Sequence, residues 1–119
     1  MGDISKHFSR DEFACKCGCG FDTVDVELIT ILEDLREHFN ASITINSGCR
    51  CAKHNKEVGG EANSMHMIGR AADFVVQGPS PAKVYQYLTG QYPDKYGFGL
   101  YKTWVHADSR STKARWEKT

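Results

Sequence analysis

Hydrophobic side chains recur along this chain with two different periods, which predict helices and strands. Across residues 24–39 the apolar positions are spaced mostly by three and four, the period that buries one face of a helix. Charged residues fill the positions between them, as on a face that meets solvent. Asp22 or Thr23 is expected to cap this helix at its start.

Shorter helices are predicted by capping signals. Residues 9–12 have the spacing of a capping box. A short helix is expected over residues 52–58, where two glycines stop it. Another is expected over residues 81–88, with Ser80 as its cap and a proline at its first position. Residues 61–70 are polar and are expected to form a loop.

Period-two alternation and β-branched residues predict the strands. They are expected at residues 43–47, 71–76, 97–101 and 104–108. The last two are separated by only two residues and should form a hairpin. One more short strand is expected around residues 114–116.

Composition narrows the class of protein. The 119 residues suit a single domain over residues 1–119, and 15 basic residues balance 15 acidic ones. Without a basic surface, nucleic acid is not an expected partner. No apolar run is long enough to span a membrane, and the first seven residues lack the apolar core of a signal peptide. We therefore expect a monomer made in the cytoplasm, with neither nucleic acid nor membrane as a partner.

Five cysteines are many for this length. Cys15, Cys17 and Cys19 alternate in one segment, and Cys49 and Cys51 in another. If both segments are extended, Cys49 and Cys51 could meet two of the first three. The absence of a secretion signal argues against a disulfide framework, and the C-x-C spacing differs from that of common zinc knuckles. Reduced, partly buried thiols are thus favoured over a second zinc site or bridges.

The strongest candidates for chemistry are His66, Asp73 and His106. Asp73 stands in the apolar run 71–76, and a buried carboxylate requires a cation or several hydrogen bonds. If this strand neighbours residues 104–108, Asp73 can face His106, and His66 on the preceding loop closes the third corner. Two imidazoles and a carboxylate suit zinc, and three protein ligands leave the fourth tetrahedral position to water.

Spacing alone leaves structural roles open for each of these residues. Asp73 could form a salt bridge, for example to Arg50 or Arg70, and His106 could be a hydrogen-bonded core histidine. The remaining histidines are assigned no role: His7, His38 and His54.

Several motifs of the chain resemble peptidase family M15, the zinc D-Ala-D-Ala carboxypeptidases. Residues 64–73, S-M-H-M-I-G-R-A-A-D, resemble the family signature S-x-H-x-x-G-x-A-x-D, and residues 45–50, I-N-S-G-C-R, resemble its strand ending in S-G-x-R. Residues 54–60 are similar to the corresponding segment in the small single-domain branch of this family. Residues 97–101 and 105–110, G-F-G-L-Y and V-H-A-D-S-R, resemble the family's closing motifs. Such proteins are often encoded by phages or prophages, and their relatives include endolysins.

This resemblance implies an α+β fold of the hedgehog/DD-peptidase type, with an antiparallel sheet flanked by helices. One zinc ion would be held by His66, Asp73 and His106. Arg50 would bind a substrate carboxylate or the developing oxyanion, with an ion pair to a nearby acid as the alternative. Ser64 would line the substrate side.

The chain departs from the family pattern at the general base. Several members carry a carboxylate three residues before the last histidine, where this chain has Thr103; another branch has a histidine at the position of Trp104. Asp108, two residues after His106, could activate water as the base or could orient His106. Both roles stay open. Two further carboxylates are fallback bases: Glu57 and Glu61.

The function implied is a zinc peptidase that cleaves peptidoglycan stem peptides, either as a D-Ala-D-Ala carboxypeptidase or as an endolysin-type endopeptidase. It would act on the cell wall after release or within a phage particle. Two alternatives follow from the same residues. One is a non-catalytic zinc-binding module, favoured by Thr103; the other is a phage tail-associated component.

Overall fold

The computed structural model describes residues 3–60 and 64–118, which fold around one five-stranded sheet. The elements in chain order are η1 (Arg10–Phe13), α1 (Val26–Phe39), β1 (Ile43–Ser47), α2 (Ala52–Glu57), η2 (Met65–Ile68), β2 (Ala71–Val76), α3 (Pro81–Gln91), β3 (Gly97–Tyr101), β4 (Val105–Asp108) and β5 (Ala114–Lys118). Here η marks a 3-10 helix. Among the described residues, no helix has the length and apolar character needed to cross a bilayer.

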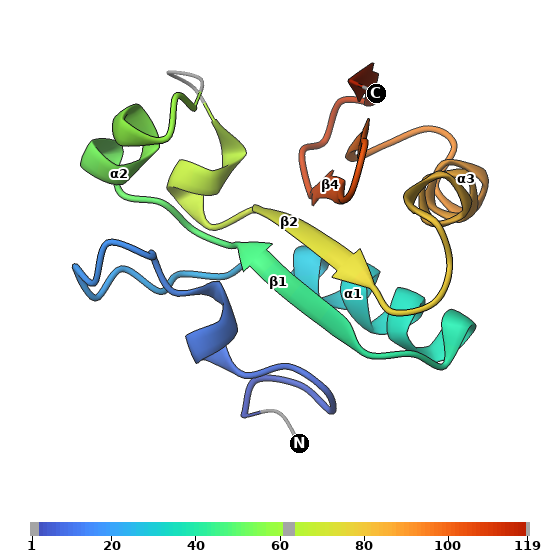
Figure 1. The fold of residues 1–119 in the computed structure, drawn as a ribbon, viewed down its shortest axis with the longest axis horizontal. Coiled ribbons are helices and arrows are strands. Elements are labelled where there is room, and N and C mark those ends of the chain that lie inside the picture. Colours follow the sequence, from blue (N-terminus) through green and yellow to red (C-terminus); the bar gives the residue numbers. More distant parts are fainter. Residues whose placement is uncertain (1–2, 61–63, 119) are drawn as a thin grey trace.

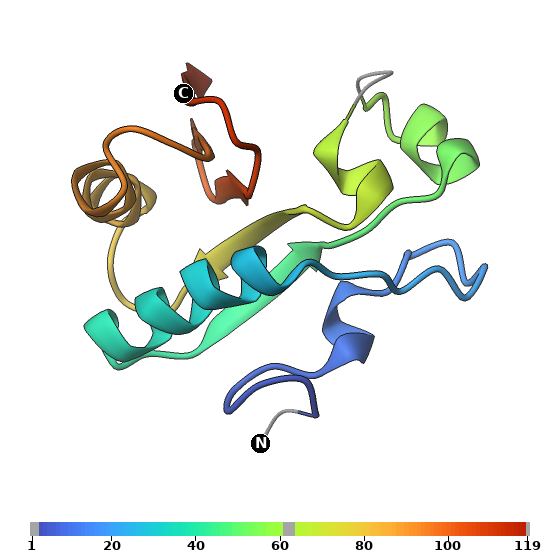
Figure 2. The same ribbon diagram turned by 180° about the vertical axis from the view of Figure 1, so that it is seen from behind.

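The strand order is β1-β2-β4-β3-β5. Figure 1 labels β1, β2 and β4, with β1 and β2 side by side. The pairs β1–β2, β2–β4 and β3–β4 are antiparallel, and β5 joins β3 in parallel. Helix α1 runs along β1 and β2 on one side, as Figure 2 shows. The predicted α+β fold with a mostly antiparallel sheet is confirmed.

The apolar face of α1 supplies much of the core. Its inward positions are fully buried, as are aromatic residues of β2 and β3, and the spacing by three and four therefore marked the buried face correctly. Burial of each such side chain stabilises the fold by about 1.5–3 kcal/mol. The fully buried residues of this group are Leu28, Ile31, Leu32, Leu35, Phe74 and Phe98.

The predicted start of α1 was wrong by two residues. The helix begins at Val26, and its cap is Asp25, whose carboxylate accepts hydrogen bonds from the N–H groups of Glu27 (3.1 Å) and Leu28 (3.4 Å). The Asp25 N–H donates to the Gly69 carbonyl at 2.9 Å. This long-range bond keeps the chain extended up to Asp25, so a tertiary contact overrides the nearer capping residues.

The predicted loop over residues 61–70 contains a 3-10 turn that was not expected. In η2, the Ser64 hydroxyl accepts a hydrogen bond from the His66 N–H at 3.1 Å. Gly69 ends the turn with φ +72°, and a side chain there would overlap the backbone of Thr23. A left-handed glycine against a neighbouring segment fixes the position of this turn.

The remaining predictions differ from the structure mainly in their extents. Ser80 caps α3, which continues to Gln91 instead of ending near residue 88. The last strand exists and extends to Lys118. This strand pairs in parallel with β3. The Arg115 guanidinium also donates hydrogen bonds to the carbonyls of Tyr96 (2.7 Å) and Tyr92 (2.6 Å), in the segment before β3.

The two cysteine segments meet differently from the expectation. Only Cys51 approaches the first group, while the Cys49 thiol donates to the carbonyl of Phe21 at 3.0 Å. The reason is that the first segment is a turn and not an extended strand. Gly18 and Gly20 both have positive φ, which lets the chain reverse there.

Candidate metal centre

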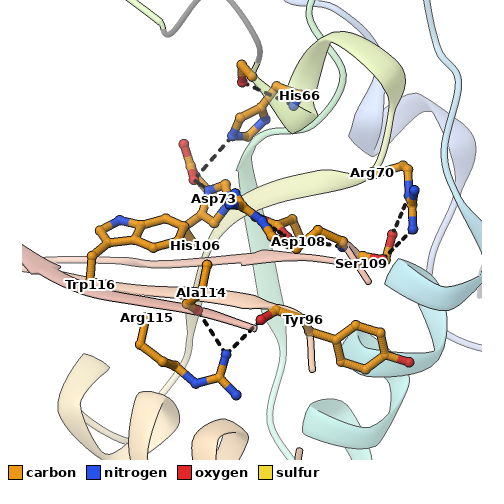
Figure 3. Close-up of polar contacts among 12 residues, drawn as sticks. His66, Arg70, Asp73, Tyr96, His106, Asp108, Ser109, Ala114, Arg115 and Trp116 are labelled. Carbon is orange, nitrogen blue, oxygen red and sulfur yellow. Dashed lines mark hydrogen bonds and ion pairs between the residues drawn. The ribbon is translucent and has the colours of Figure 1, made fainter. Parts of the chain in front are cut away.

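Sheet register brings the three predicted ligands together. Asp73 on β2 lies directly opposite His106 on β4, with His106 Nδ1 2.8 Å from Asp73 Oδ1. His66 Nε2 lies 3.4 Å from the same oxygen. The ligand atoms of the three residues are all within 4.8 Å of one another, and Figure 3 shows both rings turned toward Asp73. The predicted pairing of the two strands, with His66 at the third corner, is confirmed.

The ring of His66 is oriented by a backbone carbonyl. His66 Nδ1 lies 2.6 Å from the Gly48 oxygen. A carbonyl can only accept, so Nδ1 carries a hydrogen and Nε2 is the ring nitrogen directed toward Asp73. The Arg50 N–H also donates to the His66 carbonyl at 2.8 Å. The segment after β1 thus holds His66 by both its ring and its backbone.

The ring of His106 is oriented by a carboxylate. Its Nε2 lies 2.8 Å from Asp108 Oδ2, which leaves Nδ1 facing Asp73. Arg110 holds Asp108 in turn, with Nε 2.8 Å from Oδ1 and Nη2 2.7 Å from Oδ2. Asp108 has no exposed surface, and a side chain at Gly97 of β3 would collide with its carboxylate. This carboxylate is enclosed and fully engaged by protein groups.

Electrostatics keep the two carboxylates ionised. Burial alone would raise the pKa of Asp73, but hydrogen bonds from His106 and His66 hold that pKa well below its usual range. Burial opposes charge at Asp108 as well, yet His106 and Arg110 hold its pKa equally low. One anionic oxygen ligand beside two imidazole nitrogens fits the donor set of zinc.

The candidate ligands lie in the wall of a cleft of about 870 Å³. Its described lining residues include three cations and one carboxylate, that of Asp73. Two buried N–H groups of the cleft wall, Arg50 Nε and Trp104 Nε1, have no hydrogen-bond acceptor within the described part of the chain. Buried donors without acceptors are costly, so both are suited to a bound ligand that supplies oxygen atoms. The three cations are Arg50, Arg110 and Lys118.

Neither arginine that could have neutralised Asp73 does so. Arg50 Nη2 donates to the Ser64 hydroxyl at 3.3 Å, and within the described residues Arg50 forms no ion pair with an acid. Arg70 instead binds Ser109, with Nε 3.0 Å from its hydroxyl and Nη2 close to its carbonyl. Both residues that were predicted to lie on the substrate side, Arg50 and Ser64, line the cleft.

Comparison with known proteins decides the family. The model of the family described as Peptidase M15 matches residues 6–108, a span that includes all three candidate ligands. This chain belongs to peptidase family M15. A search of curated proteins returned no significant match. The M15 family is zinc-dependent, in agreement with the donor set described above.

At the position three residues before His106, where the family resemblance predicts a carboxylate, this chain has Thr103, which does not line the cleft. Trp104 stacks on Tyr101, with ring centroids 4.6 Å apart, and both rings line the cleft. Thr103 lines a separate small hollow beside Val75. Glu57 is not among the cleft residues, and Glu61 lies outside the described residues. In the described part of the cleft wall, Asp73 is the only carboxylate.

Three groups around this M15 site were not foreseen. The Gly48 carbonyl leaves no trace in the sequence, because every residue has one. Arg110 could have been found, since a cation two residues after Asp108 on an extended chain can reach its carboxylate. Trp116 of β5 packs on His106, with ring centroids 5.0 Å apart, and only the parallel pairing of β5 brings it there (Figure 3).

Proposed function

We propose that this M15 peptidase is a zinc enzyme that hydrolyses peptide bonds in peptidoglycan stem peptides. The observation that supports it is the convergence of His66 Nε2, His106 Nδ1 and one Asp73 oxygen on the wall of a cleft rich in cations. These three residues would hold the zinc ion, which when bound acts as a Lewis acid on the scissile carbonyl and lowers the pKa of water.

The role of the surrounding protein is to fix the ligands before substrate arrives. Gly48 and Asp108 each occupy the ring nitrogen that does not face Asp73, so the other nitrogen of each imidazole is the one directed at the place where the ion would bind. Asp108 is enclosed by Arg110 and does not line the cleft. We therefore assign Asp108 as a positioning residue for His106 in preference to the general base.

Substrate recognition would depend on the cationic side of the cleft. Arg50 lies on the wall with its Nε free of acceptors in the described residues, next to the Ser64 hydroxyl. A guanidinium in this place can bind a substrate carboxylate or stabilise the oxyanion that develops at the attacked carbonyl. Trp104 Nε1 offers a second donor to a peptide carbonyl. Both interactions suit a peptide with an anionic end.

The test is digestion of purified peptidoglycan by the zinc-loaded protein, with fragments identified by mass spectrometry and EDTA as a control. We expect chelator-sensitive release. Free D-Ala would identify a carboxypeptidase, and larger stem peptides an endopeptidase. His66→Ala should abolish release, whereas His38→Ala, on the exposed face of α1, should not. Full turnover by His66→Ala would refute the assignment.

A non-catalytic zinc-binding module is the second candidate function. The observation that favours it is that the described cleft wall holds no acid besides Asp73. Thr103, at the position where the family resemblance predicts a carboxylate, lies outside this wall. Stoichiometric zinc with no fragment released from peptidoglycan would establish it.

The setting in which the protein works stays a prediction from the family resemblance. We expect a monomer that reaches the wall after release from the cell or as part of a phage particle. Fractionation of purified particles, with an antibody against the chain, would separate the virion component from the free lysis enzyme.

A further inference from the structure

Four of the five cysteines converge at a second place in the molecule. The Sγ atoms of Cys15 and Cys17 are 3.4 Å apart, those of Cys15 and Cys51 3.8 Å, and those of Cys17 and Cys51 3.6 Å. With Cys19 included, all four sulfurs lie within 4.8 Å of one another. The four come from two segments that are more than thirty residues apart in the sequence.

These separations match a tetrahedral sulfur site. A zinc–sulfur bond of about 2.3 Å places the sulfurs of a regular tetrahedron about 3.8 Å apart. A disulfide would instead pair two sulfurs at about 2.05 Å and leave the other two outside. We propose that Cys15, Cys17, Cys19 and Cys51 bind a structural zinc ion, separate from the histidine centre. From the sequence alone, reduced thiols were favoured over a second zinc site or bridges. The positions of the four sulfur atoms favour the zinc site instead.

The backbone around the first three cysteines is built to gather them. In an extended strand, alternate residues would lie about 6.6 Å apart along one face. Here Gly18 and Gly20 adopt φ values of +80° and +90°, and the Cys15 N–H closes the turn by donating to the Phe21 carbonyl at 2.7 Å. A turn that only glycine adopts readily thus replaces the strand spacing by sulfur contact distances.

Backbone N–H groups are also directed at the sulfurs. The Cys51 N–H lies 3.5 Å from Cys15 Sγ, and the His54 N–H lies 3.5 Å from Cys51 Sγ. Zinc binds thiolates, and N–H donors to ligand sulfur stabilise the negative charge that thiolates carry. The His54 contact is also the N-cap of α2, and both contacts place donors where the charge of the thiolates would lie.

The fifth cysteine shows that the grouping is selective. Cys49 is buried, and its thiol donates to the Phe21 carbonyl instead of joining the cluster. Four cysteine ligands complete a tetrahedron and leave no position for water, which is the mark of a structural zinc site. Cys17 and Cys19 are exposed, so the ion can enter from solvent.

An ion at this site would link two segments of the chain, one of which supports the histidine centre. It would tie the turn over residues 15–20 to Cys51, which directly follows Arg50 in the sequence. The same short segment provides the Gly48 carbonyl that orients His66. The cysteine site would therefore brace the segment from which the cleft takes Arg50 and the support of His66.

The experiment is metal counting and cobalt substitution on the full chain. We expect two zinc ions per chain by elemental analysis. Cobalt(II) in their place should give an intense thiolate-to-cobalt charge-transfer band in the near ultraviolet. The double variant Cys17→Ser/Cys19→Ser should lose one ion and that band. The matched control Cys49→Ser should keep both, because serine can make the same hydrogen bond to Phe21.

The outcome is read independently of peptidase activity. His66→Ala should lose one ion and keep the thiolate band, so failure of the histidine centre cannot be mistaken for failure of the cysteine site. One ion per wild-type chain without the band would overturn the proposal, as would a disulfide among the four cysteines in protein purified under reducing-agent-free, metal-replete conditions. The wild-type spectrum decides even if the double variant does not fold.

Discussion

The two candidate metal centres are built on opposite principles. In the histidine centre, strand register places Asp73 and His106 in the middle of a sheet. Hydrogen bonds from the rings to the Gly48 carbonyl and the Asp108 carboxylate fix their orientation. In the cysteine cluster, the ligands come from a glycine turn and a helix start, outside the sheet. A rigid frame can leave a ligand position open for chemistry. A turn with few contacts of its own needs a closed set of ligands to become rigid.

The comparison predicts that loss of the histidine centre removes function with little effect on folding. Asp73→Asn keeps the side-chain volume but removes the anionic ligand, so zinc should leave this centre. Turnover should fall about a thousandfold or more, since a metal Lewis acid contributes several kcal/mol to transition-state stabilisation. Initial rates on peptidoglycan fragments measure the effect, with the exposed Asp94→Asn as the control. A fall of less than tenfold would contradict the proposed ligand set.

Loss of the cysteine centre should have the reverse effect, on stability more than on chemistry. An ion at about one hundred times its Kd stabilises the folded state by about 2.7 kcal/mol. In Cys17→Ser/Cys19→Ser the midpoint of thermal unfolding should therefore drop by about 10 °C. Calorimetry in zinc buffer measures this, with Cys49→Ser as the comparison. An unchanged midpoint would mean that no ion braces this turn.

Asp108→Asn distinguishes a positioning residue from a general base. If Asp108 orients His106, zinc affinity at the histidine centre should fall about 10–100-fold, because the second hydrogen bond of a ligand histidine tunes its binding. Competition with a chromophoric chelator measures the affinity, and kcat is measured at saturating zinc. A large loss of kcat with unchanged zinc affinity would instead identify Asp108 as the base.

The smallest effect concerns the polar contacts that hold the N-terminal segment. Glu33 of α1 accepts hydrogen bonds from the Ser5 hydroxyl (2.6 Å) and the His7 N–H (2.8 Å). Burial opposes its ionisation, but these bonds and the contact of the His7 ring, whose Nδ1 lies 2.6 Å from Glu33 Oε1, lower the pKa of Glu33 below its usual value. The stabilisation is therefore complete above the pKa of the unfolded chain, about 4.3, and is lost as the pH falls through the lower folded value.

Glu33→Gln should thus lower the stability by about 1 kcal/mol at neutral pH, and the two melting curves should converge in acid. Thermal unfolding between neutral pH and strongly acidic pH tests this, with the exposed Glu37→Gln on the same helix as the control. A constant difference at all pH values would show that the ionised form of Glu33 contributes nothing. The size of the stability loss measures how much the side-chain contacts of Glu33, without a metal ion, stabilise the N-terminal segment.

The sequence predicted those features that repeat or alternate. The periodic apolar face of α1, the strand segments and the opposition of Asp73 and His106 all follow from side-chain periods of 3.6 and two. The register was predictable because a carboxylate in an apolar strand must find a partner, and the facing strand carried a histidine.

Features that depend on contacts distant in the sequence were not predictable. The cap of α1 moved to Asp25 because the Gly69 carbonyl binds its N–H. The expected meeting of Cys49 and Cys51 with the first cysteines required an extended segment, whereas the positive φ values of Gly18 and Gly20 turn that segment. Likewise, β5 gave no sign that it would pair in parallel. Backbone carbonyls such as that of Gly48 have no signature at all. In each case the deciding feature belongs to the backbone, which every sequence shares.

Residues 48–51 serve both centres, since Gly48 supports His66 while Cys51 belongs to the cysteine cluster. Binding free energies are reciprocal, so any factor by which an ion at the cysteines tightens zinc at the histidines equals the factor by which the second ion tightens the first. A titration read at either centre then reports on the other. The larger this factor, the fewer chains would carry a single ion where zinc is scarce.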